Sequence, residues 1–350
     1  MHALQGLSPA LLAREFPELT AAEARRVAAA VVRDGPRALV GPLVQVRRTA
    51  MDALRSRGHV PALDVRAEQA SRVDPFVKYV FAGTDGAPFE GVRIPLARPG
   101  RYSVCVSSQV GCALACAFCA TGRLGLRRNL EAWEIVEQVR EIRGRLPDGA
   151  RVHGVVFQGM GEPLANLDRV LAAIAVLSDP SALAIDARAI TVCTSGLPAG
   201  IRRLAREAPR VRLGLSLAAA RRDVRRSLMP IDGAHPLPEV LAAAAEHART
   251  TGLAPMFAVT LLRGHNDGEA DAAALAALVH DFTQSAGVRP RLTILAYNPI
   301  SADDDPFTRT PAADEARFRD WLADRGVFTH RRYSGGSDVA AACGQLAARA

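Results

Sequence analysis

The chain has 350 residues, 49% of them apolar, and a formal net charge of +8 at pH 7. This length allows one large domain and a smaller one, and the apolar fraction is normal for a globular protein. No run of 18 apolar residues and no signal peptide stand out, so we expect a cytoplasmic chain without a membrane partner. Six cysteines, three of them clustered, indicate metal or redox chemistry in a reducing compartment and not a disulfide scaffold.

Nearly all the basic side chains are arginine, and the segment 202–226 holds nine of them against Glu207 and Asp223. Arginine suits bidentate phosphate binding and stacking on bases, so this segment is a candidate contact for the phosphate backbone of a nucleic acid. A solvated face in an arginine-rich proteome explains the charge equally well.

Residues 1–75 are predicted to be helical. One short helix begins at Ser8 and Pro9, a second begins with the capping-box pattern of Thr20 and Glu23, and a third lies near 42–57. We interpret this part as a small basic helical domain that packs against the larger domain or contacts RNA. Residues 76–94 then alternate like a β-hairpin, and we place the domain boundary near residue 90.

Beyond residue 100, strand and helix patterns alternate, which is typical of a parallel α/β fold. Strands are expected at 102–106, 152–157, 189–194, 211–217, 256–262, 291–296 and 327–333. Helices are expected at 130–146, 166–178, 198–208, 237–250, 269–283 and 312–325. These elements make about six β/α units, too few for a closed eight-fold barrel, and in such folds chemistry occurs at the C-terminal ends of the strands.

Three thiols at C-x3-C-x2-C spacing, Cys112, Cys116 and Cys119, follow the strand at 102–106. Thiolates select zinc, Cu(I) or iron–sulfur clusters, and a structural zinc site normally needs four protein ligands. No fourth Cys or His lies nearby, so the three thiols suit a [4Fe–4S] cluster with one open iron. A zinc knuckle or three unconnected thiols would also fit these residues. The spacing resembles the signature of the radical S-adenosylmethionine (SAM) superfamily.

Polar residues follow several strands. Gln158-Gly-Met-Gly-Glu-Pro163 pairs two glycines, which let a ligand approach the backbone, with the carboxylate of Glu162. Cys193, Ser216 and Asn298 end other strands, where helix capping or turn formation explains each one alone.

A glycine-rich C-terminal segment, 334–346, carries Cys343. A near-terminal cysteine on a mobile loop is a candidate reactive thiol, and Cys105, just before the three-thiol motif, makes a candidate redox partner.

Four motifs together resemble the RlmN/Cfr family of radical SAM RNA adenine methyltransferases, over about residues 76–346. They are Cys-Val-Ser-Ser-Gln-Val-Gly-Cys-Ala-Leu-Ala-Cys-Ala-Phe-Cys-Ala-Thr-Gly at 105–122, Gly-Met-Gly-Glu-Pro-Leu-Ala-Asn at 159–166, Tyr-Asn-Pro at 297–299 and Ala-Ala-Cys-Gly-Gln-Leu at 341–346. The resemblance implies a partial (β/α)6 barrel. It divides the chain into a small helical accessory domain with the hairpin (1–90), a radical SAM core (91–330) and a C-terminal loop (331–350).

The resemblance also implies the chemistry. Cys112, Cys116 and Cys119 would hold the [4Fe–4S] cluster, and two SAM molecules would be used per turnover. One would methylate Cys343, and the second would yield a 5′-deoxyadenosyl radical that takes a hydrogen from the S-methyl group. The methylene radical would then add to an adenine carbon, a position where a polar methyl transfer fails.

Further roles carry over from the family. Cys105 would attack the Cys343 sulfur, which releases the product and leaves a Cys105–Cys343 disulfide. Glu90 matches the family's proton acceptor. The SAM contacts fall on Gly161, Glu162, Ser216 and Asn298, and on Cys193, where family members usually carry Ser. The partners would be RNA and a flavodoxin-type electron donor.

The sequence departs from the family at Ala218, where the usual residue is His, and at Ser337 and Ala340, where carboxylates are usual. The leading interpretation is methylation of adenine carbon 2 in 23S ribosomal RNA and also in transfer RNA. The residues do not separate this from methylation at carbon 8. Two further interpretations are a radical SAM enzyme retuned to a non-RNA substrate and an RNA-binding protein with a structural metal site.

Overall fold

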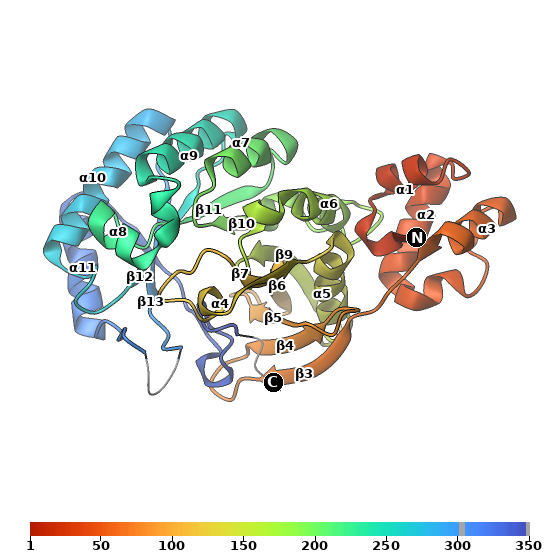
Figure 1. The fold of residues 1–350 in the computed structure, drawn as a ribbon, viewed down its shortest axis with the longest axis horizontal. Coiled ribbons are helices and arrows are strands. Elements are labelled where there is room, and N and C mark those ends of the chain that lie inside the picture. Colours follow the sequence, from red (N-terminus) through yellow and green to blue (C-terminus); the bar gives the residue numbers. More distant parts are fainter. Residues whose placement is uncertain (301–304, 348–350) are drawn as a thin grey trace.

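A ten-stranded sheet runs through the larger part of the molecule, and the N-terminal residues of the chain form a separate group of helices beside it (Figure 1). The computed structural model describes residues 1–300 and 305–347. The strand order is β14-β13-β12-β11-β10-β9-β6-β5-β4-β3, and the sheet is open, with β14 and β3 as its two edges.

The N-terminal helices are α1 (Pro9–Glu15), α2 (Ala21–Asp34) and α3 (Arg48–Arg57). Ser8 caps α1, and Thr20 with Glu23 forms the expected capping box of α2. The helices share a hydrophobic core of their own, built around Leu12, Phe16 and Leu54. Short strands β1 (His2–Ala3) and β2 (Gly58–His59) pair in parallel and join the two ends of this unit.

The prediction that all of residues 1–75 are helical is wrong after residue 57. Strand β3 (Asp64–Ala70) pairs antiparallel with β4 (Val77–Ala82). It is an edge strand whose residues alternate between exposed and partly buried, and only Val65 and Ala67 are apolar on its partly buried face. A period-2 pattern that weak is difficult to detect without its partner strand.

The predicted hairpin is confirmed as β4 and β5 (Pro88–Pro95), which pair antiparallel. Strand β5 also pairs antiparallel with β6 (Arg101–Val106), so the hairpin extends the main sheet. Residue 90 lies inside β5. The hydrophobic core of the N-terminal helices ends at Leu54, and Leu63 already belongs to the core of the sheet. We therefore propose a boundary near residue 63 in place of residue 90.

The parallel half of the sheet agrees with the expected partial (β/α)6 barrel. Its strands are β6, β9 (Arg151–Phe157), β10 (Ile190–Thr194), β11 (Arg212–Ser216), β12 (Met256–Leu261), β13 (Arg291–Ala296) and β14 (Thr329–Arg331). Their helices are α5 (Ala132–Gly144), α6 (Leu167–Ser178), α7 (Pro198–Glu207), α9 (Leu237–Thr251), α10 (Glu269–Ala286) and α11 (Ala312–Asp324). These helices lie along the outside of the curved sheet (Figure 1).

Three elements near the three-thiol motif were not predicted. Strands β7 (Gln109–Cys112) and β8 (Gly125–Asn129) form a separate antiparallel pair, with the one-turn helix α4 (Ala120–Arg123) between them. A further helix, α8 (Arg222–Leu228), precedes α9. Within the described residues, no helix is both long and apolar enough to cross a bilayer.

Candidate active site

The three-thiol loop is held in a tight path between β7 and α4. Gly111 has φ +76°, and a Cβ on it would lie 1.9 Å from the Gly125 carbonyl oxygen. A Cβ on Gly122 would lie 2.9 Å from the backbone N and O of Cys116. The Ala117 N–H donates to the Leu228 carbonyl, 2.9 Å away, which ties the loop to α8. A side chain at position 111 or 122 would collide with the backbone, so this path requires glycine at both positions.

The three thiols line one cavity at the carboxyl ends of the parallel strands. The cavity is also lined by four of the five predicted SAM contacts and by the C-terminal thiol: Gly161, Glu162, Cys193, Ser216 and Cys343. Burial raises the pKa of Cys112 to about 11 and that of Cys116 to about 12. Bound iron would hold both as thiolates.

These residues suit an iron–sulfur cluster by the chemistry of their donors, because three soft ligands face one cavity. In residues 1–300 and 305–347, no three His, Cys, Asp or Glu side chains converge on a single-ion site. A cluster does not need such convergence, since each thiolate binds its own iron. Which residues hold a cluster in this chain remains a proposal.

Glu162 is fully buried at the end of β9 and shapes the cavity wall. Its carboxylate accepts hydrogen bonds from the backbone N–H groups of Leu164 (3.0 Å) and Ser195 (2.9 Å). Burial raises the pKa of Glu162 to about 7, although these hydrogen bonds oppose the rise. Gly161 has φ +99°, and a Cβ on it would lie 2.5 Å from the Gln109 Cβ, so the turn requires glycine.

The C-terminal loop carries Cys343 into the same cavity. Its backbone N–H donates to Ser334 Oγ (2.9 Å), and its carbonyl accepts from Asn298 Nδ2 (3.3 Å). The Gly344 carbonyl accepts from the Ala120 N–H of α4, 2.8 Å away. Asn298, predicted as a SAM contact, therefore touches the loop and is absent from the cavity wall.

Two aspartates fasten the start of this loop to the turn between β3 and β4. Asp74 Oδ2 accepts from the Gly336 N–H (2.8 Å) and from Tyr333 Oη (2.9 Å). Asp338 accepts from Ser71 Oγ (2.7 Å) and from the Arg72 N–H (2.8 Å). The sequence did not indicate this fastening, because the partners are more than 250 residues apart.

Cys105 lies outside the cavity wall, buried in β6 at 7% exposure. All six cysteines are free, so the disulfide between Cys105 and Cys343 that the resemblance implies is not formed in this structure. Burial raises the pKa of Cys105 well above its usual range and that of Cys193 to about 12. Cys343 raises both further, and the Arg332 guanidinium opposes the rise.

Arg332 was not predicted as a site residue. It interacts electrostatically with Cys105, Cys193 and Cys343, and its Nη1 donates to Gln158 Oε1, 2.8 Å away. It follows β14, and its position beside the thiols depends on how the edge strand curves around the sheet. No local sequence pattern distinguishes it from the other arginines.

Glu90 lies inside the sheet, next to the C-terminal segment. Its Oε1 is 3.1 Å from Lys78 Nζ, and its Oε2 accepts from the Ala347 N–H, 2.9 Å away. Glu90 is absent from the cavity lining. The structure brings it to the chain four residues after Cys343, and its predicted role as proton acceptor stays a prediction.

Arg225 is a second residue whose place was missed. It is fully buried, and its Nε is 3.1 Å from Asp232 Oδ1. It also donates to the carbonyls of Ser195 (2.8 Å) and Ser216 (3.1 Å), which follow β10 and end β11 at the cavity. From the sequence, Arg225 was among the candidate phosphate contacts of the segment 202–226. In the structure it connects two loops of the site instead.

The basic segment 202–226 has fewer arginines free to bind phosphate groups than its net charge indicated. Six of its nine arginines pair with carboxylates: Arg202, Arg203, Arg210, Arg221, Arg222 and Arg225. The remaining three, Arg206, Arg212 and Arg226, do not form a run. The segment therefore gives weaker support for RNA binding than its composition alone.

Comparison with known proteins agrees with this fold. Residues 106–276 match the radical SAM superfamily. A probable RNA methyltransferase of Sorangium cellulosum is 60% identical over 343 residues, covering 93% of this chain and 87% of that protein. The dual-specificity RNA methyltransferase RlmN of Syntrophobacter fumaroxidans is 41% identical over 284 residues, covering 81% of this chain and 79% of that protein. The crystal structure of a radical SAM methyltransferase from Sphaerobacter thermophilus covers 100% of both chains, with 34% identity and a TM-score of 0.86.

The fold and the three-thiol loop are those of a SAM-dependent radical enzyme. Within that class, the chain belongs to the RlmN family of radical SAM RNA methyltransferases. The family resemblance that the motifs carried is thereby confirmed.

Proposed function

We propose that this protein methylates carbon 2 of an adenine in 23S ribosomal RNA, with transfer RNA as a second substrate, through a methylated Cys343. The observation that carries the proposal is that Cys343 and the three thiols of the 112–119 loop line one cavity. A radical enzyme that uses a protein thiol as methyl carrier needs the carrier within reach of the radical source. The bound cluster and SAM would supply a carbon-centred radical, which the protein's own side chains cannot generate.

The side chains of this protein would bind the cluster and SAM, position Cys343 and release the product from it. Cys112, Cys116 and Cys119 would ligate the cluster. Gly161, Glu162, Cys193 and Ser216 line the cavity and would contact SAM, and Asn298 would hold the Cys343 backbone. Glu90 would accept a proton beside the C-terminal loop, and Cys105 would attack the Cys343 sulfur.

The last of these steps balances within the protein. The Cys105 thiolate forms an S–S bond with the Cys343 sulfur, while the bond between that sulfur and the methylene carbon attached to the adenine breaks. The electron pair of the broken bond stays on the methylene carbon, which takes up a proton and becomes the methyl group. The product disulfide is reduced by an external donor, for which a flavodoxin-type or thiol reductant is the chemical class required.

Methyl-labelled SAM, reductant and the iron-loaded protein, incubated with ribosomal and transfer RNA, test the proposal. We expect 2-methyladenosine by mass spectrometry of the digested RNA, and 8-methyladenosine would correct the position. Cys343→Ala should abolish methyl transfer while iron content is kept. Full methylation by Cys343→Ala, or labelled product on peptides and none on RNA, would overturn the proposed function.

A further inference from the structure

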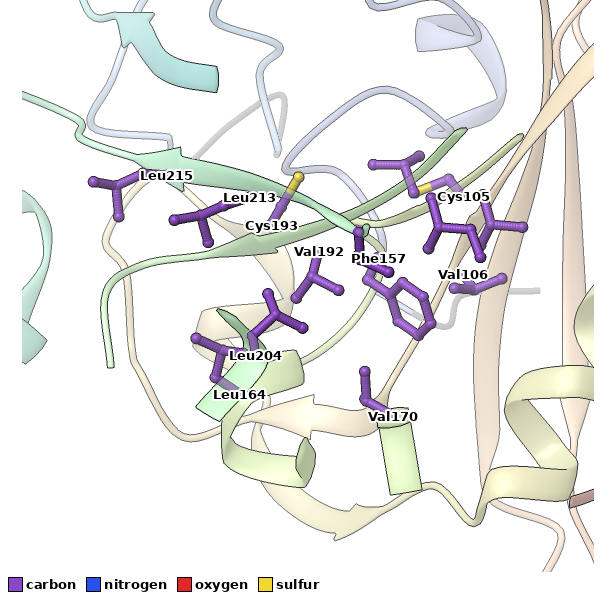
Figure 2. Close-up of a cluster of buried hydrophobic side chains, with 14 of the residues drawn as sticks. Cys105, Val106, Phe157, Leu164, Val170, Val192, Cys193, Leu204, Leu213 and Leu215 are labelled. Carbon is purple, nitrogen blue, oxygen red and sulfur yellow. The ribbon is translucent and has the colours of Figure 1, made fainter. Parts of the chain in front are cut away.

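Cys193 stands where family members usually carry Ser, and it faces the cavity with Cys343. Figure 2 shows the Cys193 sulfur on the opposite side of β10 from Val192, which points into the buried apolar cluster. Cys193 and Cys343 both line the cavity, whereas Cys105 is absent from its lining. Cys343 interacts electrostatically with both Cys105 and Cys193, so Cys193 is a second thiol neighbour of Cys343.

The neighbouring strand leaves room for this sulfur. Cys193 pairs with Gly214 across β10 and β11, and a Cβ on Gly214 would lie 2.8 Å from Cys193 Sγ. Any side chain at position 214 would therefore displace the thiol. Arg332 interacts electrostatically with all three thiols, Cys105, Cys193 and Cys343.

Cys105 and Cys193 cannot pair with each other. Cys105 is level with Val156 of β9, and Val156 is level with Thr191 of β10, so the two cysteines are two strands apart. Two strand spacings separate their backbones by roughly 10 Å. A disulfide needs Cα atoms within about 7 Å. A disulfide between these two cysteines is therefore excluded, whereas Cys343 interacts electrostatically with each of them.

We infer that Cys193 is a second resolving thiol, which can attack Cys343 in place of Cys105. This inference rests on the proposed function. The Cys193 thiol gives up its proton and forms an S–S bond with Cys343, and the bond between Cys343 sulfur and the RNA-linked carbon breaks. The electron pair goes to that carbon, which takes a proton and becomes the methyl group. The two cysteines are left oxidised as a Cys193–Cys343 disulfide, which the external reductant then reopens.

Trapping of the protein–RNA adduct tests the inference. After one turnover without excess reductant, Cys105→Ala should hold only part of the RNA covalently, and its tryptic digest should contain a peptide pair linked through Cys193 and Cys343. Cys105→Ala combined with Cys193→Ser should hold several times more RNA and yield no such pair. Equal trapping by the two variants, without a linked peptide, would overturn the inference. Wild-type protein that gives methyladenosine and a Cys105–Cys343 linkage in the same assay keeps the proposed function intact.

A second measurement needs neither cluster nor SAM. Cys105→Ala protein without iron, titrated with oxidised glutathione, should form the Cys193–Cys343 linkage, detected as one linked peptide after alkylation of the remaining thiols. In Cys105→Ala combined with Cys193→Ser, Cys343 should carry glutathione instead. If Cys343 takes up glutathione to the same extent in both variants and no linked peptide forms, the two sulfurs do not meet and the inference is wrong. This arm decides the question even if the double variant forms no RNA adduct.

Discussion

Lys78 and Glu90 form an ion pair in the interior of the sheet, with 3.1 Å between Nζ and Oε1 and side-chain exposures of 4% and 1%. They come from the adjacent strands β4 and β5. Glu90 also accepts a hydrogen bond from the Ala347 N–H. The pair therefore connects the hairpin to the segment that follows Cys343.

Removal of the lysine should be costly. Lys78→Met removes this buried cation from beside the Glu90 carboxylate, and we expect the free energy of unfolding to fall by about 3–5 kcal/mol. Urea-induced unfolding followed by circular dichroism measures it. The matched control is Arg66→Met, which breaks the exposed pair with Asp64 and should cost less than about 1 kcal/mol. Similar losses in both variants would contradict a special role for the buried pair.

SAM binding should depend on pH through Glu162. Burial raises its pKa to about 7, so the carboxyl is largely neutral below that pH and charged above it. If the carboxylate holds the SAM ammonium group, affinity should rise as the pH increases through about 7. It should fall again above about pH 8, where an α-amino group loses its proton.

Equilibrium dialysis of iron-loaded protein with SAM between pH 6 and 9 measures this profile. Glu162→Gln should bind more weakly at pH 7.5 and lose the rise near pH 7. A wild-type affinity that is flat from pH 6 to 7.5 would remove Glu162 from the amino-group contact.

The buried pair of Arg225 and Asp232 should control both stability and the cavity. Arg225→Met leaves Asp232 buried without its main cation and frees the carbonyls of Ser195 and Ser216, so we expect a loss of about 3–5 kcal/mol. SAM binding should weaken as well, because the two loops lose their common donor. Arg226→Met, at the exposed neighbouring position, should change neither quantity by more than a small fraction. Thermal unfolding and dialysis report on the two effects separately.

The aspartates that fasten the C-terminal loop should limit access to Cys343. Asp74→Asn and Asp338→Asn each weaken charge-assisted hydrogen bonds to the turn between β3 and β4, and the double variant should raise the alkylation rate of Cys343 several-fold. Peptide mapping after timed N-ethylmaleimide treatment measures that rate. Asp148→Asn, at an exposed position away from the loop, is the control. An unchanged rate in the double variant would mean that Asn298 and Ser334 hold the loop without the aspartates.

The hydrogen bonds that Asp74 accepts from the C-terminal loop should weaken only at acidic pH. Burial alone would raise the pKa of Asp74, but hydrogen bonds from the Gly336 N–H and Tyr333 lower it below its ordinary value of 3.8. The stabilisation is therefore complete above that value and is lost as the pH falls below it. The alkylation rates of wild type and variant, corrected for the thiolate fraction, should converge only in strong acid.

Much of this protein could be predicted from its sequence, because the signals are local. Periodicity located every strand of the parallel half and its helices α5, α6, α7, α9, α10 and α11 within a few residues, whereas the short helix α8 was missed. The C-x3-C-x2-C spacing indicated the cluster, and the family motifs indicated the enzyme class. The edge strand Asp64–Ala70 was missed, since its alternation is weak and its partner lies outside any short window. The hairpin β7–β8 was missed because the glycine and cysteine residues around it favour a loop.

The sequence by itself determined the donors, the fold class and the family, since each depends on residue type and spacing along the chain. Only the tertiary structure decided which of the cysteines lie together in the cavity. It placed Cys193 with Cys343 on the cavity lining and left Cys105 off that lining, brought Arg332 into interaction with all three thiols, and paired Glu90 with Lys78. It also turned Arg225 from a presumed phosphate contact into a buried link between two loops. Such relationships arise from strand order and curvature, which bring residues from distant parts of the chain into one site, and no short stretch of sequence encodes them.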